Sequence, residues 1–531
     1  MKLDSEAIDI SIEELERVVD GARHQTLSQD EHRKLRAAVE TLGQMARMLA
    51  DRDATLRQLR QMLLKPATTE KTRAVLERAG IPGNGSKPVP TVAEKQPRKG
   101  HGRKPARAFV AAEKVAVPHP LLQPGDRCPE CAKGKVYPLK DPALRVRIIG
   151  QAPVQATVYE LARLRCNLCQ EVYEAPAPVG IGADKRDETA ASMVAVLKYG
   201  SGVPFYRLAG LQDNLGIPLP VSTQWDMMAA AAAPLEPAYA ELIRQAAQGQ
   251  VLYNDDTAAR ILALQRETPA DRRGVFTTGI VATAQGRKIT LFFSGDKHAG
   301  ENLADVLKQR AAELPPPIQM CDALSRNVPK GLAVILGNCL AHCRRHYVEV
   351  AANFAPECQY VLETLGAVYG YDEEAHRVVM SDIERLVHHQ ARSGPLMYEL
   401  RQWGQQQLDE HRVEPNSGLG QAIAYMLNHW EKLTLFLRQA GAPLDSNIVE
   451  RALKKAILLR KNALFFKTRN GARVGDLFMS LIHSCESCGG NPFDYLTQLQ
   501  RHADELAQNP SRWMPWNYRA TLDEAALSSV A

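Results

Sequence analysis

The stretch Val251-Leu-Tyr-Asn-Asp-Asp-Thr257 predicts a short β-strand that ends in two acids. Two further runs, residues 274–284 and 289–294, are rich in β-favouring residues and flank the turn residues Gln285-Gly-Arg287. Together the three runs predict an antiparallel meander. Its first strand would deliver carboxylates to one edge of the sheet.

The next part of the chain extends this sheet. Residues 299–313 predict a helix, Ile318-Gln-Met-Cys-Asp322 predicts a strand that again ends in an acid, and residues 333–337 predict a last strand. The expected order β-β-β-α-β-α-β is that of a ribonuclease H-like sheet, in which the first strand lies beside the strand that follows the first helix. We therefore expect Asp255 and Asp322 to meet.

A third acid, Glu450, lies in a predicted amphipathic helix within Leu444–Phe466, which Asp445 or Ser446 can cap. Residues three or four positions apart share a helix face, which aligns Glu450 with Asn447 and Lys454. Four apolar residues would seat the helix on a core: Leu453, Ala456, Leu459 and Ala463. For this helix taken alone, a surface ion pair between Glu450 and a neighbouring cation is the alternative.

Three carboxylates on rigid elements, Asp255, Asp322 and Glu450, can hold two Mg²⁺ or Mn²⁺ ions about 4 Å apart for phosphodiester chemistry. Asp256 is either a further ligand or a supporting residue, and the sequence leaves both open. Basic residues surround the third acid and predict contacts with DNA phosphates: Arg451, Lys454, Lys455, Arg460 and Lys461.

Composition limits the class of protein. The chain has 531 residues, 45% of them hydrophobic, which predicts three or four domains with sizeable cores. No apolar run reaches the roughly 18 residues of a membrane span, and no signal peptide opens the chain, so a cytoplasmic protein is expected. A net charge of +6 leans toward a nucleic-acid partner.

The N-terminal region, residues 1–79, predicts a leucine-zipper-like helix. Its leucines recur every seven residues, at Leu35, Leu42, Leu49, Leu56 and Leu63. This pattern fits a coiled coil that forms a homodimer or a higher oligomer. It also fits an intramolecular helical hairpin. Residues 80–120 predict a flexible basic linker, which is either solvated or binds DNA through Arg98, Lys99, Arg103 and Lys104.

Two Cys-x-x-Cys pairs mark the next segment, residues 121–180. Four thiolates from two tight turns predict one structural Zn²⁺ in a ribbon-like module; a redox pair and idle thiols are the alternatives. The predicted ligands are Cys128, Cys131, Cys166 and Cys169. Residues 181–249 then predict a helical block, which is either a helix-turn-helix that contacts DNA through Lys198, Tyr199, Arg207 and Gln224, or a helical subdomain packed on the core.

The catalytic part is expected in two pieces, residues 250–346 and 441–500. Residues 347–440 between them predict a helical insertion, broken at Gly394-Pro395. Cys339-x-x-His342-Cys343-x-x-His346 either binds metal or forms a helix that brings His342 near the acids. Residues 501–531 predict a docking tail whose last dozen residues are disordered.

Several blocks resemble the insertion sequence 66 family of DDE transposases. They are Asn254-Asp-Asp-Thr257, Cys321-Asp322-Ala-Leu-Ser-Arg-Asn327, Cys339-Leu-Ala-His342-Cys-Arg-Arg345, Asp445-Ser-Asn447-Ile-Val-Glu450-Arg451 and Arg460-Lys-Asn462. The first block departs from the family, which more often has Ala-Asp-Glu-Thr. The order of the regions also resembles that family. The expected fold class is a multidomain α+β and α/β chain with a ribonuclease H-like catalytic domain.

The resemblance implies a catalytic triad of Asp255, Asp322 and Glu450. It implies supporting roles for Asp256, His342, Asn447, Arg451 and Lys461. The implied reaction is cleavage of insertion-element ends by water, followed by attack of the freed 3′-hydroxyl on target DNA, beside small accessory proteins of the same element. Two alternatives remain: a nuclease that cleaves without joining, and a domesticated zinc and zipper DNA-binding protein.

Overall fold

In the computed structural model, two compact units form: residues 1–81 with 345–363, and residues 82–344 with 364–531. The structure describes residues 18–19, 28–29, 31–32, 35, 116–118, 120–131, 133–137, 151–165, 167, 172–178, 185–267, 274–284 and 286–530. The predicted zipper and basic linker, including Arg98, Lys99, Arg103 and Lys104, lie almost entirely outside these residues.

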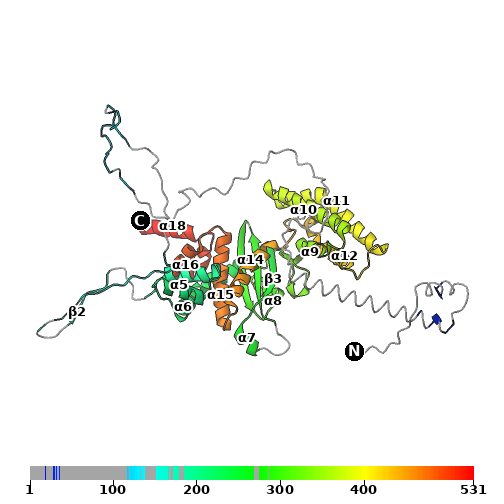
Figure 1. Cartoon of the computed structure of the whole chain (residues 1–531), viewed down its shortest axis with the longest axis horizontal. Helices are drawn as coiled ribbons and strands as arrows, with labels where there is room; N and C mark the ends of the chain where they lie inside the picture. Colours follow the sequence, from blue (N-terminus) through cyan, green and yellow to red (C-terminus); the bar gives the residue numbers. More distant parts are fainter. Residues whose placement is uncertain are drawn as a thin grey trace. The chain divides into compact units, whose positions relative to one another are not determined.

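A five-stranded mixed sheet with the strand order β5-β4-β3-β6-β7 forms the centre of the second unit (Figure 1). Strand β3 is antiparallel to β4 and parallel to β6. The first strand therefore lies beside the strand that follows the first helix, as the sequence predicted. The strands are β3 (Val251–Ala258), β4 (Phe276–Ala284), β5 (Arg287–Gly295), β6 (Ile318–Cys321) and β7 (Ile335–Asn338).

The predicted element order is wrong at two points: helix α7 (Leu262–Glu267) lies between β3 and β4, and no α-helix separates β6 from β7. A single 3₁₀ turn, η3 (Ser325–Asn327), takes its place. The reason is a pair of side chains: Asn254 Nδ2 and Gln319 Nε2 each donate to the carbonyl of Asn327 at 2.7 Å. These bonds hold the turn in the core. The carbonyl of Asn327 therefore accepts hydrogen bonds from side chains and not from the backbone N–H groups of a helix.

Helices pack on both sides of the sheet. Helix α14 (Asn447–Ala463) lies against β3 and β4, whereas α8 (Ala299–Leu307) contacts the same two strands and α6 (Val221–Ala247). Gly279, the β4 partner of Asp255, permits the close approach of α14, since a Cβ there would lie 3.0 Å from Leu453. The acid of β3 and the Glu450 helix are thereby brought together.

Helix α15 (Arg469–Ser487) closes the open edge of the sheet at β5 (Figure 1). Three of its residues, spaced four apart, accept hydrogen bonds from successive outward backbone N–H groups of β5. Ser484 Oγ accepts from Thr290 N at 2.9 Å, Ser480 Oγ from Phe292 N at 2.9 Å, and Asp476 Oδ2 from Ser294 N at 2.7 Å. An unpaired edge invites pairing with other chains, and this ladder removes it.

The remaining elements are mostly helical. Before the sheet come β1 (Arg163–Arg165), β2 (Val172–Glu174), α4 (Glu188–Ala195), the π-helix η2 (Val196–Gly200) and α5 (Phe205–Asn214). Helix α7 (Leu262–Glu267) follows β3. After β7 come α9 (Leu340–Val350), α10 (Ala355–Arg377), α11 (Asp382–Asp409), α12 (Gly418–Asn428), α13 (Trp430–Leu433) and η4 (Leu435–Leu437). The chain ends with α16 (Pro492–Arg501), α17 (Ala503–Gln508), η5 (Pro510–Trp513) and α18 (Tyr518–Val530).

Three expectations about these helices are wrong. Helix α11 runs through Gly394-Pro395 without a break, because buried Met397 and Leu400 hold the following turns by tertiary packing. The last dozen residues form most of α18, whose Tyr518 is buried against the ring of Tyr495 at 5.0 Å between centroids.

The helix-turn-helix residues are also misplaced. Tyr199 and Gln224 are buried, and Gln224 Nε2 donates to Leu219 O at 2.8 Å and to Phe205 O at 3.0 Å. These two side chains are therefore packing and turn-holding residues and cannot read DNA bases. Within the described part of the chain, no helix combines the length and the apolar character that crossing a bilayer requires.

Candidate active site

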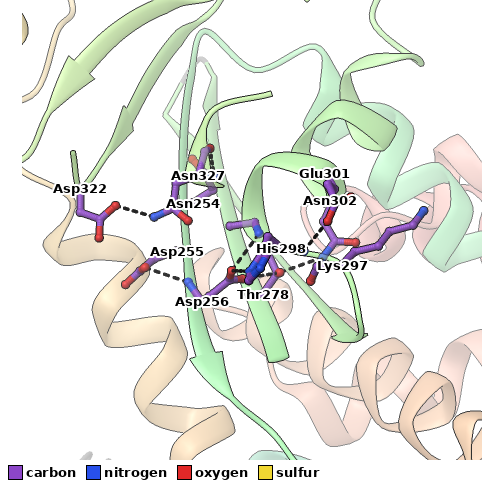
Figure 2. A network of polar contacts seen from close by, with 11 residues as sticks. Asn254, Asp255, Asp256, Thr278, Lys297, His298, Glu301, Asn302, Asp322 and Asn327 are labelled. Atoms are coloured by element: carbon purple, nitrogen blue, oxygen red, sulfur yellow. Dashed lines mark hydrogen bonds and ion pairs between the residues drawn. The ribbon is translucent and has the colours of Figure 1, made fainter. Parts of the chain in front are cut away.

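Neighbouring acids of β3 point to opposite sides of the sheet, because successive side chains of a strand alternate. Figure 2 shows Asp255 on the side of Asp322 and Asp256 on the side of His298. Burial, together with the negative charges of Asp322, Asp256 and Glu450, raises the pKa of Asp255 to about 7, against an opposing hydrogen bond from the Asp256 backbone. Asp255 therefore lies within electrostatic reach of both other predicted catalytic acids.

Asp322 directly follows β6 and is held by its own turn. Its Oδ1 accepts hydrogen bonds from Asn327 Nδ2 at 2.5 Å and from Leu324 N at 3.1 Å (Figure 2). Asn338 Nδ2 donates to its backbone carbonyl at 3.2 Å. These bonds occupy Oδ1 and fix the carboxylate, and Oδ2 is the oxygen that they leave for a ligand.

A buried amide network lies directly behind Asp322. Asn254, Gln319 and Asn327 are each completely buried, and Gln319 Nε2 donates to Asn254 Oδ1 at 2.8 Å. Sequence reasoning missed Gln319, although a glutamine in the otherwise apolar strand Ile318–Cys321 is a visible signal. The hydrogen bonds of Asn254 and Gln319 to Asn327, and of Asn327 to Asp322, restrict the geometry here, so these amides set the position of Asp322 relative to β3.

Glu450 lies in the first turns of α14, with its side chain 16% exposed. His342 Nε2, from the start of α9, lies 3.6 Å from Glu450 Oε1. Cys339 Sγ accepts a hydrogen bond at 3.2 Å from the backbone N–H of Ser446, which joins the start of α9 to the start of α14. His342 is thus a neighbour of the acids, whereas Cys339 is a buried structural thiol.

The start of α14 is organised by Asp445. Its Oδ1 accepts from Asn447 N at 3.0 Å and its Oδ2 from Asn447 Nδ2 at 2.6 Å. Asp445 therefore performs the capping, although Ser446 is the N-cap residue by position and its side chain forms no cap bond. Val449, Leu453, Ala456 and Leu459 form the buried face.

Asp256 does not share the environment of the catalytic acids. Its side chain is 1% exposed, and its Oδ1 accepts from Thr278 Oγ1 at 2.6 Å. Its Oδ2 accepts from Ala299 N at 2.9 Å and lies 3.3 Å from His298 Nδ1 (Figure 2). With both oxygens engaged at the N-terminus of α8, Asp256 joins β3, β4 and α8.

The basic residues of α14 divide into two groups. Arg451, Lys454 and Lys461 are exposed and can reach DNA phosphates from the solvent. Lys455 is also exposed, and its Nζ lies 3.5 Å from Glu486 Oε2. Arg460 instead donates from Nη1 to Thr257 Oγ1 at 3.3 Å and to the carbonyl of Ala258, which ties α14 to the end of β3.

The donor chemistry of the three acids suits a hard divalent cation, which prefers carboxylate oxygens. Their mutual repulsion, visible in the raised pKa of Asp255, is relieved by a cation. Within the described residues, however, no group of three or more His, Cys, Asp or Glu side chains is already arranged to hold a metal ion. Binding therefore requires the side chains to converge further.

The structure describes two of the four predicted zinc ligands, Cys128 and Cys131. Cys166 and Cys169 lie outside the described residues. Cys131 Sγ accepts from the backbone N–H of Gly134 at 3.5 Å, and Cys128 N donates to Gly134 O at 2.8 Å, which forms a tight turn. Backbone N–H groups of Gly134 and Lys133, with the Cys128 side chain, lower the pKa of Cys131.

The five-stranded mixed sheet, with acids in or directly after two of its parallel strands and on a flanking helix, is the arrangement of a mixed α/β domain. Residues 186–474 match the Transposase IS66 family, and the chain belongs to that family. The fold is consistent with a ribonuclease H-like DDE catalytic domain, and membership implies a catalytic transposase that binds DNA.

Similar proteins occur in Sinorhizobium fredii (strain NBRC 101917 / NGR234). The chain is 25% identical to uncharacterized protein y4jD over 417 residues, which are 75% of this chain and 80% of the relative. It is also 25% identical to uncharacterized protein y4hP over 454 residues, 80% of this chain and 78% of the relative.

Proposed function

We propose that this protein cleaves the ends of an insertion element and joins them to target DNA, with Asp255, Asp322 and Glu450 as the catalytic acids. The observation that carries the proposal is electrostatic: the negative charges of Asp322 and Glu450 both raise the pKa of Asp255. Divalent cations and a phosphodiester bound between these acids would relieve the repulsion.

The three carboxylates would hold the two Mg²⁺ or Mn²⁺ ions, which supply activation of the nucleophile and stabilisation of the leaving oxygen when bound. Asn327 holds Asp322 through Oδ1, and Asn447 is held in turn by Asp445. His342 lies beside Glu450 and orients its carboxylate. These residues position the acids and do not themselves react.

DNA is held by exposed cations beside the acids. Arg451, Lys454 and Lys461 extend from the same helix as Glu450, so a backbone bound to them passes the site. We assign Asp256 to structural support, since both of its oxygens are engaged away from Asp255. The partners are the terminal inverted repeats, target DNA, a second copy of the chain and small accessory proteins of the element, in the bacterial cytoplasm at the nucleoid.

One structural Zn²⁺ at Cys128, Cys131, Cys166 and Cys169 completes the proposal. Support comes from the Cys128–Gly134 turn, where backbone N–H groups face the sulfur of Cys131 and favour its thiolate. A thiolate is the form that binds zinc.

The test is cleavage and joining of a labelled element end in Mg²⁺ or Mn²⁺, with wild type, Asp322→Asn and Glu450→Gln. Joined products from wild type, and at least a 100-fold loss in both variants with DNA binding retained, are expected. The matched control is Asp305→Asn, an exposed acid of α8. Cleavage without joining would indicate a nuclease, and DNA binding without cleavage would indicate a DNA-binding protein.

A further inference from the structure

A small cavity lies beside the catalytic acids, between the π-helix η2, the end of β3 and the second half of α14. Its volume is about 30 Å³. That is enough for about two water molecules, or for the non-bridging oxygens of one phosphate group. Its polar lining consists of Lys198, Thr257, Arg260, Thr277, Ser294 and Arg460.

Lys198 is the unusual residue of this cavity. It is only 9% exposed, and its Nζ lies 4.1 Å from the ring centroid of Phe205. Burial alone lowers its pKa to about 8, with no contribution from an acid. A buried lysine without a carboxylate costs stability and is rarely kept in a core, so its ammonium is held ready for an anion that arrives from outside.

Arg460 and Thr257 converge on the same space. Arg460 Nη1 bonds Thr257 Oγ1 and the carbonyl of Ala258, and a guanidinium has five donors, so this anchoring leaves donors for an anion. Asp476, a buried acid that bonds the cavity-lining residue Ser294, is already occupied, since its two oxygens accept from the N–H and the hydroxyl of Ser294. The positive charges of the cavity are therefore not neutralised by Asp476.

The backbone also closes around this cavity. Helix α14 ends at Leu464, whose φ of 69° is rarely adopted by a residue with a side chain. This turn sends the chain back, so that Phe466 N donates to Arg260 O at 2.9 Å. A strained turn is maintained only where the surrounding contacts require it, and here it holds two sides of the cavity together.

We propose that the cavity binds a phosphate of the DNA backbone, about one nucleotide from the phosphodiester at the proposed catalytic acids, through Lys198 and Arg460. Thr257 follows Asp255 by two residues, roughly 7 Å along a strand. Consecutive phosphates of one DNA strand lie about 6–7 Å apart, so the offset is about one step. This inference rests on the proposed function and adds a fixed register for the bound strand.

The experiment compares the salt dependence of binding to a random-sequence duplex for wild type, Lys198→Met and Lys198→Arg. A lost phosphate contact should reduce the slope of log K against log salt by about 0.9 in Lys198→Met. Lys198→Arg should keep the slope. The matched control, Lys330→Met, removes the same charge from an exposed position away from the cavity and should leave the slope unchanged.

Thermal unfolding separates binding from structure. Lys198→Met should melt at or above the wild-type temperature, because an unpaired buried charge is replaced by an apolar chain of similar length. A clear drop in melting temperature would make Lys198 a structural residue and overturn the proposal, as would an unchanged slope. If inorganic phosphate raises the melting temperature of wild type while Lys198→Met keeps the DNA slope, the cavity is a small-anion site and the DNA assignment is wrong.

Failure of this inference is distinguishable from failure of the proposed function. If wild type cleaves and joins element ends and Lys198→Met has an unaltered salt slope, only the proposed phosphate site is wrong. The proposed catalytic function then stands. Wild type that binds DNA and never cleaves removes the proposed catalysis, and with it the placement of this phosphate relative to a reacting group.

Discussion

Asp255 makes the stability of the protein depend on pH. Its pKa is raised from 3.8 to about 7, so the folded state loses stability as the pH rises from the unfolded value to the folded value. Without divalent metal, wild type should lose up to about 4 kcal/mol of unfolding free energy between pH 4 and pH 7 relative to Asp255→Asn. Urea unfolding in a chelator measures this, and parallel pH profiles for the two proteins would contradict it.

Asn327 positions Asp322, and its replacement should damage catalysis more than binding. Asn327→Leu removes the 2.5 Å bond to Asp322 Oδ1, and residues that orient ligands typically affect activity by about 10–100-fold. Cleavage rate should fall within that range, while affinity for DNA stays the same. The Mg²⁺ concentration that gives the half-maximal cleavage rate should also rise. A residue with only a structural role would leave that concentration unchanged.

At the scale of elements, strand β3 places two adjacent acids, Asp255 and Asp256, in different environments. Asp256→Ala leaves three donors without their carboxylate, namely Thr278, His298 and the first N–H of α8, and should cost about 2–4 kcal/mol of unfolding free energy. Asp305→Ala, on the exposed side of the same helix, should cost less than about 1 kcal/mol. Equal losses for both variants would refute the assignment.

The ladder between α15 and β5 predicts a second effect on stability. Ser480→Ala leaves the buried N–H of Phe292 unsatisfied and should cost about 1–3 kcal/mol. Ser487→Ala, an exposed serine of the same helix, provides the control and should change stability by less than about 0.5 kcal/mol. Chemical denaturation of both variants measures these changes. It decides whether the stability of the β5 edge depends on the side chains of α15.

At the scale of the whole molecule, metal content tests the predicted N-terminal module. Purified protein should contain one zinc per chain, and Cys131→Ser should lose it because three ligands bind zinc far more weakly than four. Cys488→Ser is the control, since its thiol contacts Lys288 O at 3.7 Å and belongs to another Cys-x-x-Cys pair. Zinc retained in Cys131→Ser would contradict the assignment.

Sequence alone predicted the sheet well, because periodicity and turn residues are local properties. The runs around Val251, Phe276 and Ile318 all form strands, and the buried face of α14 was predicted from its spacing. The continuity of α11 was not predictable, because packing overrides the local signal of Gly394-Pro395. The prediction of a disordered tail rested on its position, whereas the Ala, Leu and Glu residues of α18 favour a helix.

The sequence by itself determined which residues could carry charge to the site, through acids at strand ends and a third acid on an amphipathic helix. Only the tertiary structure decided how these residues divide the work. Asp255 and Asp256 are chemically alike and adjacent, yet strand alternation sends one to the other acids and the other to the start of α8. The burial of Lys198 and the network around Asn327 depend on contacts between distant segments, which no local pattern encodes.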